Sequence, residues 1–366
     1  MRTAFGSYWI ERKVAIGGMA EIFLAYDAHD HQVAIKKIHP DLASQEKFIQ
    51  MFLDEVRIVI QLNHPHIVQL LDFGLADGAY FFAMEWIDGK SLAEIISAQK
   101  KKQGHFPIDV ALWMLRDVCA GLHHAHTKQD RYQKAMNLVH RDISPPNIMS
   151  GRDGVFKVAD FGIAHVRDKN VKTLPGIIRG KFSYMSPEQS LGKELDQRSD
   201  IFSTGVVFYE LLTGTRLFLR KNEIETLDAV RRCQVPAIRG IRPEVSNAVE
   251  ELIKKALSVT PANRFRNAEE FQKAAEKILE TEFPQSTRAG DVVAYFQKLF
   301  PQEKFKERKP KTAEWRIQKH SLSLESVSSV AVMQYAVAHR YWMSVGIGLS
   351  VILLVEGFVR YFCKLA

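Results

Sequence analysis

Apolar residues recur with two different periods along this chain, and the period changes near residue 90. Residues 8–90 contain short alternating apolar runs separated by turn signals, with one longer amphipathic stretch near residues 44–62. Alternation at every second residue is typical of half-buried strands, whereas spacings of three and four residues are typical of helices. Helical spacing dominates the later segments, such as DVALWMLRDVCAGLHHAH and VSNAVEELIKKALS. The pattern therefore predicts an α+β fold, in which a small sheet carrying one helix precedes a larger helical part.

Length and composition are compatible with one large two-part core, or with two modest cores, followed by a tail. The chain has 366 residues, and 46% of them are hydrophobic, which excludes disorder throughout. The three cysteines, Cys119, Cys233 and Cys363, lie far apart, so they indicate neither a disulfide framework nor a zinc cluster. We therefore expect a reducing, cytosolic setting for the main domain. The first residues contain no apolar segment of the kind found in secretory signal peptides.

The positive charge of the chain is concentrated in its C-terminal part. The formal net charge is +8, and residues 301–320, PQEKFKERKPKTAEWRIQKH, are rich in lysine and arginine. We interpret them as part of a helical and basic linker over residues 281–340. A nucleic-acid-binding role is not expected, because neither interleaved aromatic residues nor a helix suited to a nucleic-acid groove accompanies these charges.

Residues 341–363 are a candidate membrane segment. Residues 341–355 contain no charged residue, and Glu356 is the single charge in the apolar run that continues to residue 359. A helix needs roughly 20 mostly apolar residues to cross the hydrocarbon core of a bilayer, and a basic flank favours the cytoplasmic side. We therefore predict that this segment anchors a cytoplasmic main domain to the cell membrane. The alternative is an apolar helix that docks on the folded domain or on a partner.

Two stretches in the strand-rich part contain residues suited to bind phosphate. In VAIGGMAEIFLA, residues 14–25, Gly17 and Gly18 would let backbone N–H groups approach a polyphosphate. Lys36 ends the strand-like VAIK, and Glu55 lies in the amphipathic stretch. A buried lysine needs a carboxylate partner, and such a pair can hold the ammonium group against nucleotide phosphates. We therefore expect Lys36 and Glu55 to pair.

Three further motifs lie in the helical part. VHRDISPPNIM, residues 139–149, places Asp142 and Asn147 in a turn stiffened by prolines, which is typical of a base and a metal ligand. DFG follows at residues 160–162, and SPE at residues 186–188. In order and spacing, all these motifs resemble those of eukaryotic-like (Hanks-type) protein kinases, and in particular those of bacterial serine/threonine kinases with a GGMAE loop and an HRDxSP catalytic loop.

The resemblance covers residues 8 to about 280 and implies the bilobal protein kinase fold. A small β-rich N-lobe with one helix would comprise residues 8–87, and a larger helical C-lobe residues 88–280. The resemblance also implies ATP and Mg²⁺ (or Mn²⁺) as cofactors and protein Ser and Thr hydroxyls as acceptors. In a bacterium, the membrane predicted above for residues 341–363 would be the inner membrane. The alternatives are a nucleotide-binding pseudokinase scaffold and a small-molecule phosphotransferase, which would normally lack the SPE segment.

The resemblance further implies roles for individual residues. Asp142 would accept the proton of the substrate hydroxyl, Lys36 would bind the α and β phosphates of ATP, and Glu55 would orient Lys36. Asn147 and Asp160 would hold the metal ion. The side chains or backbone groups in contact with adenine would belong to Ile22, Ala34, Met84, Glu85, Ile87 and Met149.

Other positions match structural contacts of the same family. Asp200 would brace the catalytic turn. Glu188 and Arg264 would form a buried ion pair. The apolar residues stacked between the lobes would be Val59, Leu70, His140 and Phe161.

One departure from the family pattern concerns the charge beside the catalytic base. In the family, a lysine two residues after the catalytic Asp steadies the γ-phosphate and contacts a threonine ahead of the APE-type motif. Here the first position is Ser144 and the second, in RGKFSYMSPE, is Lys181. We hypothesise that the two chemical types are exchanged, so that Lys181 places its charge beside Asp142 and the transferred phosphoryl group. The alternative is that Lys181 faces solvent.

Overall fold

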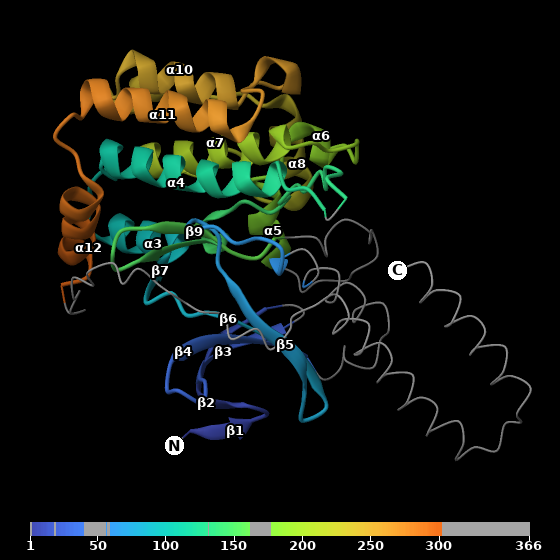
Figure 1. The fold of residues 1–366 in the computed structure, drawn as a ribbon. Coiled ribbons are helices and arrows are strands. Elements are labelled where there is room, and N and C mark those ends of the chain that lie inside the picture. Colours follow the sequence, from blue (N-terminus) through green and yellow to red (C-terminus); the bar gives the residue numbers. More distant parts are fainter. Residues whose placement is uncertain are drawn as a thin grey trace, which may run out of the picture. The chain divides into compact units, whose positions relative to one another are not determined.

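The structure is a computed structural model, and all residues that it describes belong to the first of the two units into which the chain divides, Met1–Trp315. The predicted Gly18, Glu55 and membrane segment 341–363 lie outside the described residues. Strands β1 to β6 gather at one end of this unit, and the helices gather at the other (Figure 1). The described residues are 2–17, 20–39, 56, 59–130, 132–161 and 177–301.

The N-terminal strands form a six-stranded antiparallel sheet in the order β1-β2-β3-β4-β6-β5. The sheet begins at Thr3, ahead of the predicted start of the N-lobe at residue 8. Its strands are β1 (Thr3–Phe5), β2 (Tyr8–Ile16), β3 (Ala20–Tyr26), β4 (Gln32–Ile38), β5 (Leu70–Ala76) and β6 (Ala79–Glu85).

The two faces of this sheet carry different chemistry because side chains alternate along each strand. Lys36 in β4 is paired with Ile22 in β3 and with Phe82 in β6, while Ala34 is paired with Met84. Residues that pair directly across antiparallel strands share a face, so these five side chains lie together on one side of the sheet. The opposite face carries the core of the N-lobe, which comprises Phe5, Tyr8, Ala25, Val33, Ile35, Phe81 and Ala83.

The second part of the chain is mainly helical, and it contains a small antiparallel sheet in the order β7-β8-β9. Its first elements are β7 (Gly89–Ser91), α3 (Leu92–Lys101), α4 (Ile108–His126), the 3-10 turn η1 (Pro145–Asn147), β8 (Ile148–Gly151) and β9 (Phe156–Val158). They are followed by α5 (Ile177–Phe182), α6 (Pro187–Ser190), α7 (Arg198–Thr213), α8 (Glu223–Arg232), α9 (Ile238–Ile241), α10 (Asn247–Ala256), η3 (Pro261–Asn263), α11 (Ala268–Glu282), the π-helical turn η4 (Arg288–Val292) and α12 (Val293–Leu299).

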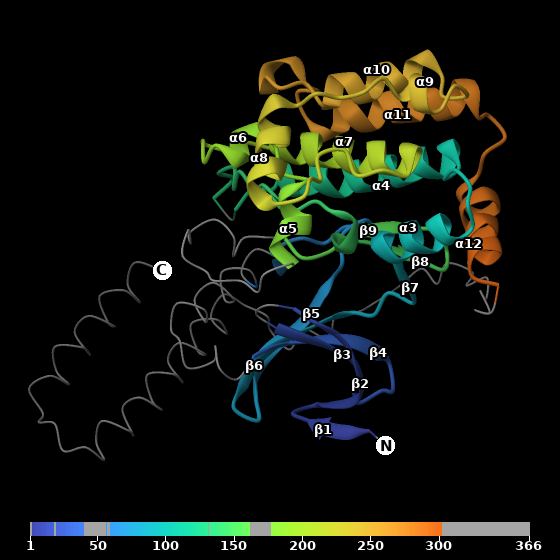
Figure 2. The same ribbon diagram turned by 180° about the vertical axis from the view of Figure 1, so that it is seen from behind.

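Helices α4 and α7 form the centre of the helical part. Both views show α10 and α11 covering them on the side away from the N-terminal sheet (Figures 1 and 2). Every residue of α7 from Ser199 to Thr213 is buried, and the helix ends where Gly214 adopts the left-handed conformation, φ 69°. Because α7 is buried on all sides, its polar groups need partners inside the protein. One of them, Asp200, binds backbone N–H groups in the turn that contains Asp142.

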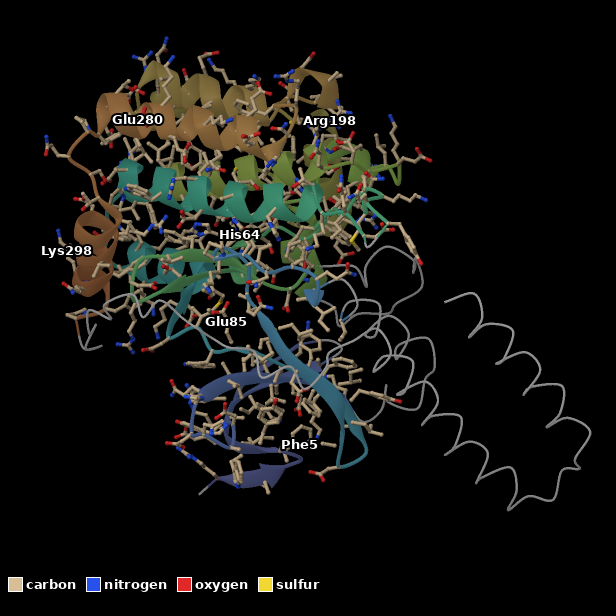
Figure 3. The ribbon with its side chains drawn as sticks, in the orientation of Figure 1. Phe5, His64, Glu85, Arg198, Glu280 and Lys298 are labelled. Carbon is tan, nitrogen blue, oxygen red and sulfur yellow. The ribbon has the colours of Figure 1, made fainter. Side chains whose placement is uncertain are left out.

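Contacts from β9 and from the loop after residue 60 join the two lobes. Lys157 in β9 donates to both carboxylate oxygens of Glu85, each at 2.7 Å. The N–H of Val68 donates to the carbonyl oxygen of Val158, and the N–H of Val158 donates to that of His66, each at 2.9 Å. Figure 3 shows Glu85 between the sheet and the helices. The predicted division into a β-rich lobe and a helical lobe is therefore confirmed.

The loop that contains His64 and His66 packs closely on α4. A Cβ atom at Gly121 of α4 would lie 2.6 Å from the carbonyl oxygen of His66, so only glycine permits this approach. The rings of His64 and His124 stack with centroids 5.0 Å apart, next to α4 (Figure 3). Burial and the neighbouring histidines lower the pKa of His64 to about 4, so this ring is neutral at pH 7. His124, near the end of α4, therefore packs against a neutral ring.

The described residues contain neither a candidate membrane span nor a cluster of metal-ligating side chains. None of their helices is both long enough and apolar enough to cross a bilayer. They also contain no group of three or more His, Cys, Asp or Glu side chains arranged to hold a metal ion. The predicted metal ligands, Asp160 and Asn147, are one carboxylate and one amide, so they would not form such a group.

Candidate active site

Lys36 and Asp160 meet where the two lobes face each other. Lys36 Nζ lies 3.0 Å from Asp160 Oδ1 and 5.1 Å from the centroid of the Phe82 ring. Burial alone would raise the pKa of Asp160, but Lys36 offsets this effect and the pKa is lowered, so the carboxylate is ionised at neutral pH. The backbone of Asp160 is left-handed, with φ 52°, a conformation that costs roughly 1–3 kcal/mol for a residue other than glycine. Its contacts must therefore hold it in place.

The catalytic turn fixes Asp142 and Asn147 relative to each other. Pro145 and Pro146 occupy the start of η1, where a missing N–H costs no hydrogen bond. Asn147 Nδ2 donates to the backbone oxygen of Asp142 at 2.8 Å and to its Oδ2 atom at 2.9 Å. These bonds use the nitrogen of the amide and fix the orientation of its oxygen. The N–H of Ala159 donates to the carbonyl oxygen of Asn147 at 2.8 Å, which joins this turn to the residue before Asp160.

Asp200, in α7, braces this turn, as predicted. Its carboxylate accepts the N–H groups of His140 at 2.7 Å and Arg141 at 2.8 Å, and His126 Nε2 lies 2.8 Å away. Burial alone would raise the pKa of Asp200, but the bonds from His126 and the backbone lower it. Arg141 has φ 68°, so the brace also holds a strained backbone conformation directly before Asp142.

Lys181 and Ser144 both contact Asp142. Lys181, in α5, places its Nζ atom 2.5 Å from Asp142 Oδ2, and Ser144 Oγ lies 3.4 Å from the backbone oxygen of Asp142. Ser144 is buried, whereas 37% of the Lys181 side chain is exposed. Lys181 is also among the cations that lower the pKa of Asp160. Its ammonium group therefore contacts Asp142, while part of the side chain remains exposed.

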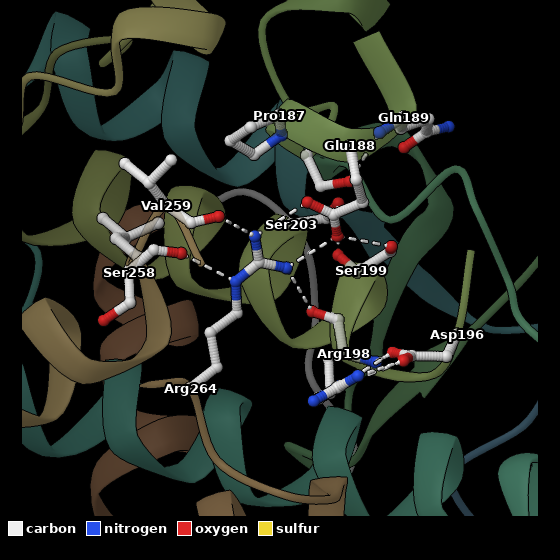
Figure 4. Close-up of polar contacts among 12 residues, drawn as sticks. Pro187, Glu188, Gln189, Asp196, Arg198, Ser199, Ser203, Ser258, Val259 and Arg264 are labelled. Carbon is white, nitrogen blue, oxygen red and sulfur yellow. Dashed lines mark hydrogen bonds and ion pairs between the residues drawn. The ribbon is translucent and has the colours of Figure 1, made fainter. Parts of the chain in front are cut away.

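The predicted ion pair between Glu188 and Arg264 is confirmed (Figure 4). Arg264 Nη1 and Nη2 bond the two Glu188 oxygens at 2.7 and 2.8 Å, and Ser199 Oγ donates to Glu188 Oε1 at 2.7 Å. Backbone oxygens of Arg198, Ser258 and Val259 accept the remaining guanidinium protons. Such a fully bonded bidentate pair fixes the SPE segment firmly to the C-lobe.

The side chains expected to contact adenine come from three neighbouring strands and from β8. Ile22, Ala34 and Met84 share the sheet face of Lys36, as the strand register requires. The N–H of Glu85 donates to Gln69 O at 2.9 Å, so the group that Glu85 can offer to a nucleotide is its carbonyl oxygen. Ile87 and, in β8, Met149 are half-buried. These residues could together receive a flat apolar ring.

Gly17 and the stacked apolar residues also occupy defined positions. The N–H of Gly17 donates to Ala20 O at 2.8 Å, so it is used inside the turn between β2 and β3. The rings of His140 and Phe161 have centroids 4.6 Å apart. All four residues of the predicted apolar stack, Val59, Leu70, His140 and Phe161, are buried.

Lys157 and Asp117 are not among the residues predicted from the sequence. Lys157 links β9 to Glu85. Asp117 is fully buried in α4, and it accepts the N–H of Phe156, the first residue of β9, at 3.1 Å. The one sequence signal for Asp117 was an acidic residue in the mostly apolar helical stretch LRDVCAG. If such a residue is buried, its carboxylate needs a partner.

The chain is similar to known protein kinases in sequence and in fold. The chain is 39% identical over 308 residues to the tyrosine-protein kinase MasK of Myxococcus xanthus, covering 83% of this chain and 48% of MasK. It is 34% identical over 268 residues to the serine/threonine-protein kinase PrkC of Bacillus subtilis, covering 73% of this chain and 40% of PrkC. The chain thus spans about half the length, or less, of these curated relatives.

A solved structure and a family model cover the same region. The crystal structure of the Mycobacterium tuberculosis PknI kinase domain is similar with a TM-score of 0.57 and 25% identity, covering 75% of this chain and 97% of that one. The family model described as protein kinase domain matches residues 8–283. This chain therefore belongs to the protein kinase family, with the bilobal fold that its sequence predicted.

Proposed function

We propose that this chain is an ATP-dependent serine/threonine protein kinase. The observation that carries the proposal is the meeting of Lys36 from the N-terminal sheet with Asp160, beside Asp142 and Asn147. An ammonium, an amide and two carboxylates are the groups that phosphoryl transfer from a nucleotide requires. A pseudokinase scaffold is less well supported, because none of these four groups has been lost.

The residues present fit a divalent cation and a nucleotide, which protein kinases use. Asp160 has a lowered pKa, and the bonds of Asn147 Nδ2 leave its amide oxygen as the atom to face a cation. Hard oxygen ligands of this kind suit Mg²⁺ or Mn²⁺, and the bound ion would neutralise phosphate charge. Lys36 would then bind the phosphates, while the apolar face that includes Ala34 would receive adenine.

Asp142 would act as the base. The acceptor hydroxyl oxygen forms a bond to the γ-phosphorus, the bond from that phosphorus to the bridging β–γ oxygen breaks, and the hydroxyl proton passes to Asp142. Asn147 would keep the carboxylate oriented, because it binds both the backbone and the side chain of Asp142. The brace from Asp200 would hold the whole turn during the transfer.

The acceptor residue needs its own evidence, because the relatives differ in their names. PrkC and PknB are named serine/threonine-protein kinases, whereas MasK is named a tyrosine-protein kinase. We favour Ser and Thr as acceptors, and tyrosine is the second candidate. Phosphoamino-acid analysis of the labelled product distinguishes them, since phosphotyrosine alone would contradict the proposed specificity.

Transfer of label from γ-labelled ATP to protein tests the proposed activity. The full chain with Mg²⁺ should label itself or a general protein substrate. Asp142→Asn should lower the rate by roughly 10²–10⁴-fold, because a positioned base contributes about that factor. Asp153→Asn, at an exposed turn where the amide keeps its bond to Val155, is the matched control and should retain the wild-type rate. Equal labelling by wild type and Asp142→Asn would contradict the assignment of the base.

Lys181 is proposed to supply the positive charge that steadies the transferred phosphoryl group. Its contact with Asp142 Oδ2 and its effect on Asp160 support this role. Because Lys181 lies in α5 and not in the catalytic turn, the charge would be in place only when this part of the segment before SPE is folded against Asp142.

An exchange of side chains tests this role. Lys181→Ala should lower kcat roughly 10²-fold, a factor typical for the loss of one electrostatic stabiliser. The double variant Ser144→Lys, Lys181→Thr returns the lysine to the catalytic turn and should recover most of that loss. Lys193→Ala, an exposed lysine after the same segment, is the control. Full activity of Lys181→Ala, or a rise above wild type, would show that the contact is dispensable or inhibitory.

Residues 341–363 are proposed to anchor the kinase domain to the membrane. Support comes from the sequence alone, through the uncharged run and its basic flank. The full chain should stay with membranes through carbonate extraction, whereas Leu353→Lys combined with Leu354→Lys should release it, because each charge at the centre of a span costs about 2.5–3.5 kcal/mol. Release of the unmutated chain by carbonate would refute the anchor.

A further inference from the structure

Residues 284–300 follow the region matched by the family model and pack back against the C-lobe. We call them the C-terminal strap. The strap contains η4, which contacts α4, and α12, which contacts α3. Both views show α12 beside α3, and Lys298 marks α12 at that edge of the helical part (Figures 1, 2 and 3).

The strap is held by apolar contacts as well as by hydrogen bonds. Val292, Phe296 and Leu299 are buried. The Phe296 ring meets that of Phe156 edge to face, with centroids 6.1 Å apart. Ser286 Oγ accepts from Trp113 Nε1 at 3.2 Å, which ties the start of the strap to α4. A segment with such contacts is part of the folded lobe and not a tether.

Arg288 in the strap supplies a charge to the buried Asp117. Arg288 Nη2 bonds Asp117 Oδ1, which Arg116 Nη1 also approaches at 3.3 Å. On the other side of the carboxylate, His66 Nδ1 lies 3.5 Å from Oδ2. Burial raises the pKa of Asp117 to about 7, and the two guanidinium groups act against this rise. Without Arg288, the buried carboxylate would keep its contact with Arg116 but would be less well compensated.

Asp117 is connected to Asp160 through β9. The carboxylate that Arg288 contacts accepts the N–H of Phe156, where β9 begins. Val158, where β9 ends, exchanges backbone bonds with His66 and Val68. Two residues later comes Asp160, whose left-handed backbone needs support from its surroundings. Arg288 therefore acts on the strand that delivers the carboxylate predicted to hold the metal ion.

We propose that Arg288 is a positioning residue of this kinase, and that through Asp117 the strap fixes β9 and hence the metal-binding geometry of Asp160. The inference rests on the proposed function in one respect, because the metal-binding role of Asp160 belongs to that proposal. Because the strap begins beyond residue 283, a kinase domain cut at the end of the family match would lack this support. Residues 301–320, the lysine- and arginine-rich part of the predicted linker, follow the strap directly in the sequence.

Full-chain variants test this role by removing the charges one at a time. Arg288→Gln leaves Asp117 with the more distant Arg116 as its guanidinium partner, whereas Asp117→Asn combined with Arg288→Gln replaces the ion pair by two neutral amides of similar size. Arg266→Gln removes an arginine whose side chain is 90% exposed and serves as the control. Hydrogen exchange of the amides of residues 156–160 is measured without nucleotide, and the Mg²⁺ concentration for half-maximal ATP binding is measured separately.

Arg288→Gln should accelerate exchange in β9 and raise the required Mg²⁺ concentration roughly tenfold, as loss of a supporting residue behind a metal ligand typically does. The double variant should recover most of both effects, and Arg266→Gln should match wild type. If Arg288→Gln exchanges and binds like Arg266→Gln, or if the double variant is no better than the single one, the positioning role is wrong.

If Arg288→Gln fails to fold, the double variant alone tests the role. Wild-type hydrogen exchange and a wild-type Mg²⁺ requirement of the double variant would support the role, and impaired values would overturn it.

The readouts separate this inference from the proposed function. Exchange in β9 is independent of phosphate transfer, so it tests the support from Arg288 even if wild type transfers no label. Wild-type protein that binds Mg²⁺ and ATP but never transfers phosphate would refute the kinase proposal alone. Transfer by wild type together with unchanged exchange in Arg288→Gln would refute the positioning role alone.

Discussion

A buried carboxylate, Asp200, holds the backbone on which the candidate active site is built. Asp200 lies in a helix that is buried on all sides, and it accepts two successive backbone N–H groups directly before Asp142. The bonds are charge-assisted, so they are stronger than ordinary backbone bonds. They hold Arg141 in a left-handed conformation, φ 68°, which is strained for a residue other than glycine. The position of the proposed base therefore depends on a side chain that never contacts a substrate.

Two other buried carboxylates of the C-lobe are held by arginines. Glu188 is bonded in bidentate fashion by Arg264, and Asp117 is bonded by Arg288. Buried ion pairs of this kind add little net stability, because desolvation offsets the attraction, but removal of one partner costs about 3–5 kcal/mol. They are therefore better understood as devices that fix geometry. The arginines of these pairs come from late in the chain, so late segments help to hold α6 and the strand before Asp160.

Local patterns and motifs predicted much of this structure, whereas contacts between distant segments were harder to foresee. Strand alternation places Ala34 and Lys36 on one sheet face, and the spacing of the motifs marks Asp142 and Asp160. The pairing of Arg288 with Asp117 has no comparable signal, because the two residues are 171 positions apart and neither periodicity nor a turn relates them. The left-handed backbone of Asp160 was equally hidden, because no glycine marks it. The roles of Gly18, Glu55 and residues 341–363 stay predictions.

The central claim is that Lys36, Asp142, Asn147 and Asp160 together receive the phosphates of a nucleotide. The most direct measurement is a crystal structure of the protein with Mg²⁺ and a non-hydrolysable ATP analogue. The account predicts phosphate oxygens within hydrogen-bonding distance of Lys36 Nζ, a cation on the oxygens of Asp160 and Asn147, and the γ-phosphorus facing Asp142. A nucleotide bound elsewhere, or phosphates that contact none of these four side chains, would contradict it.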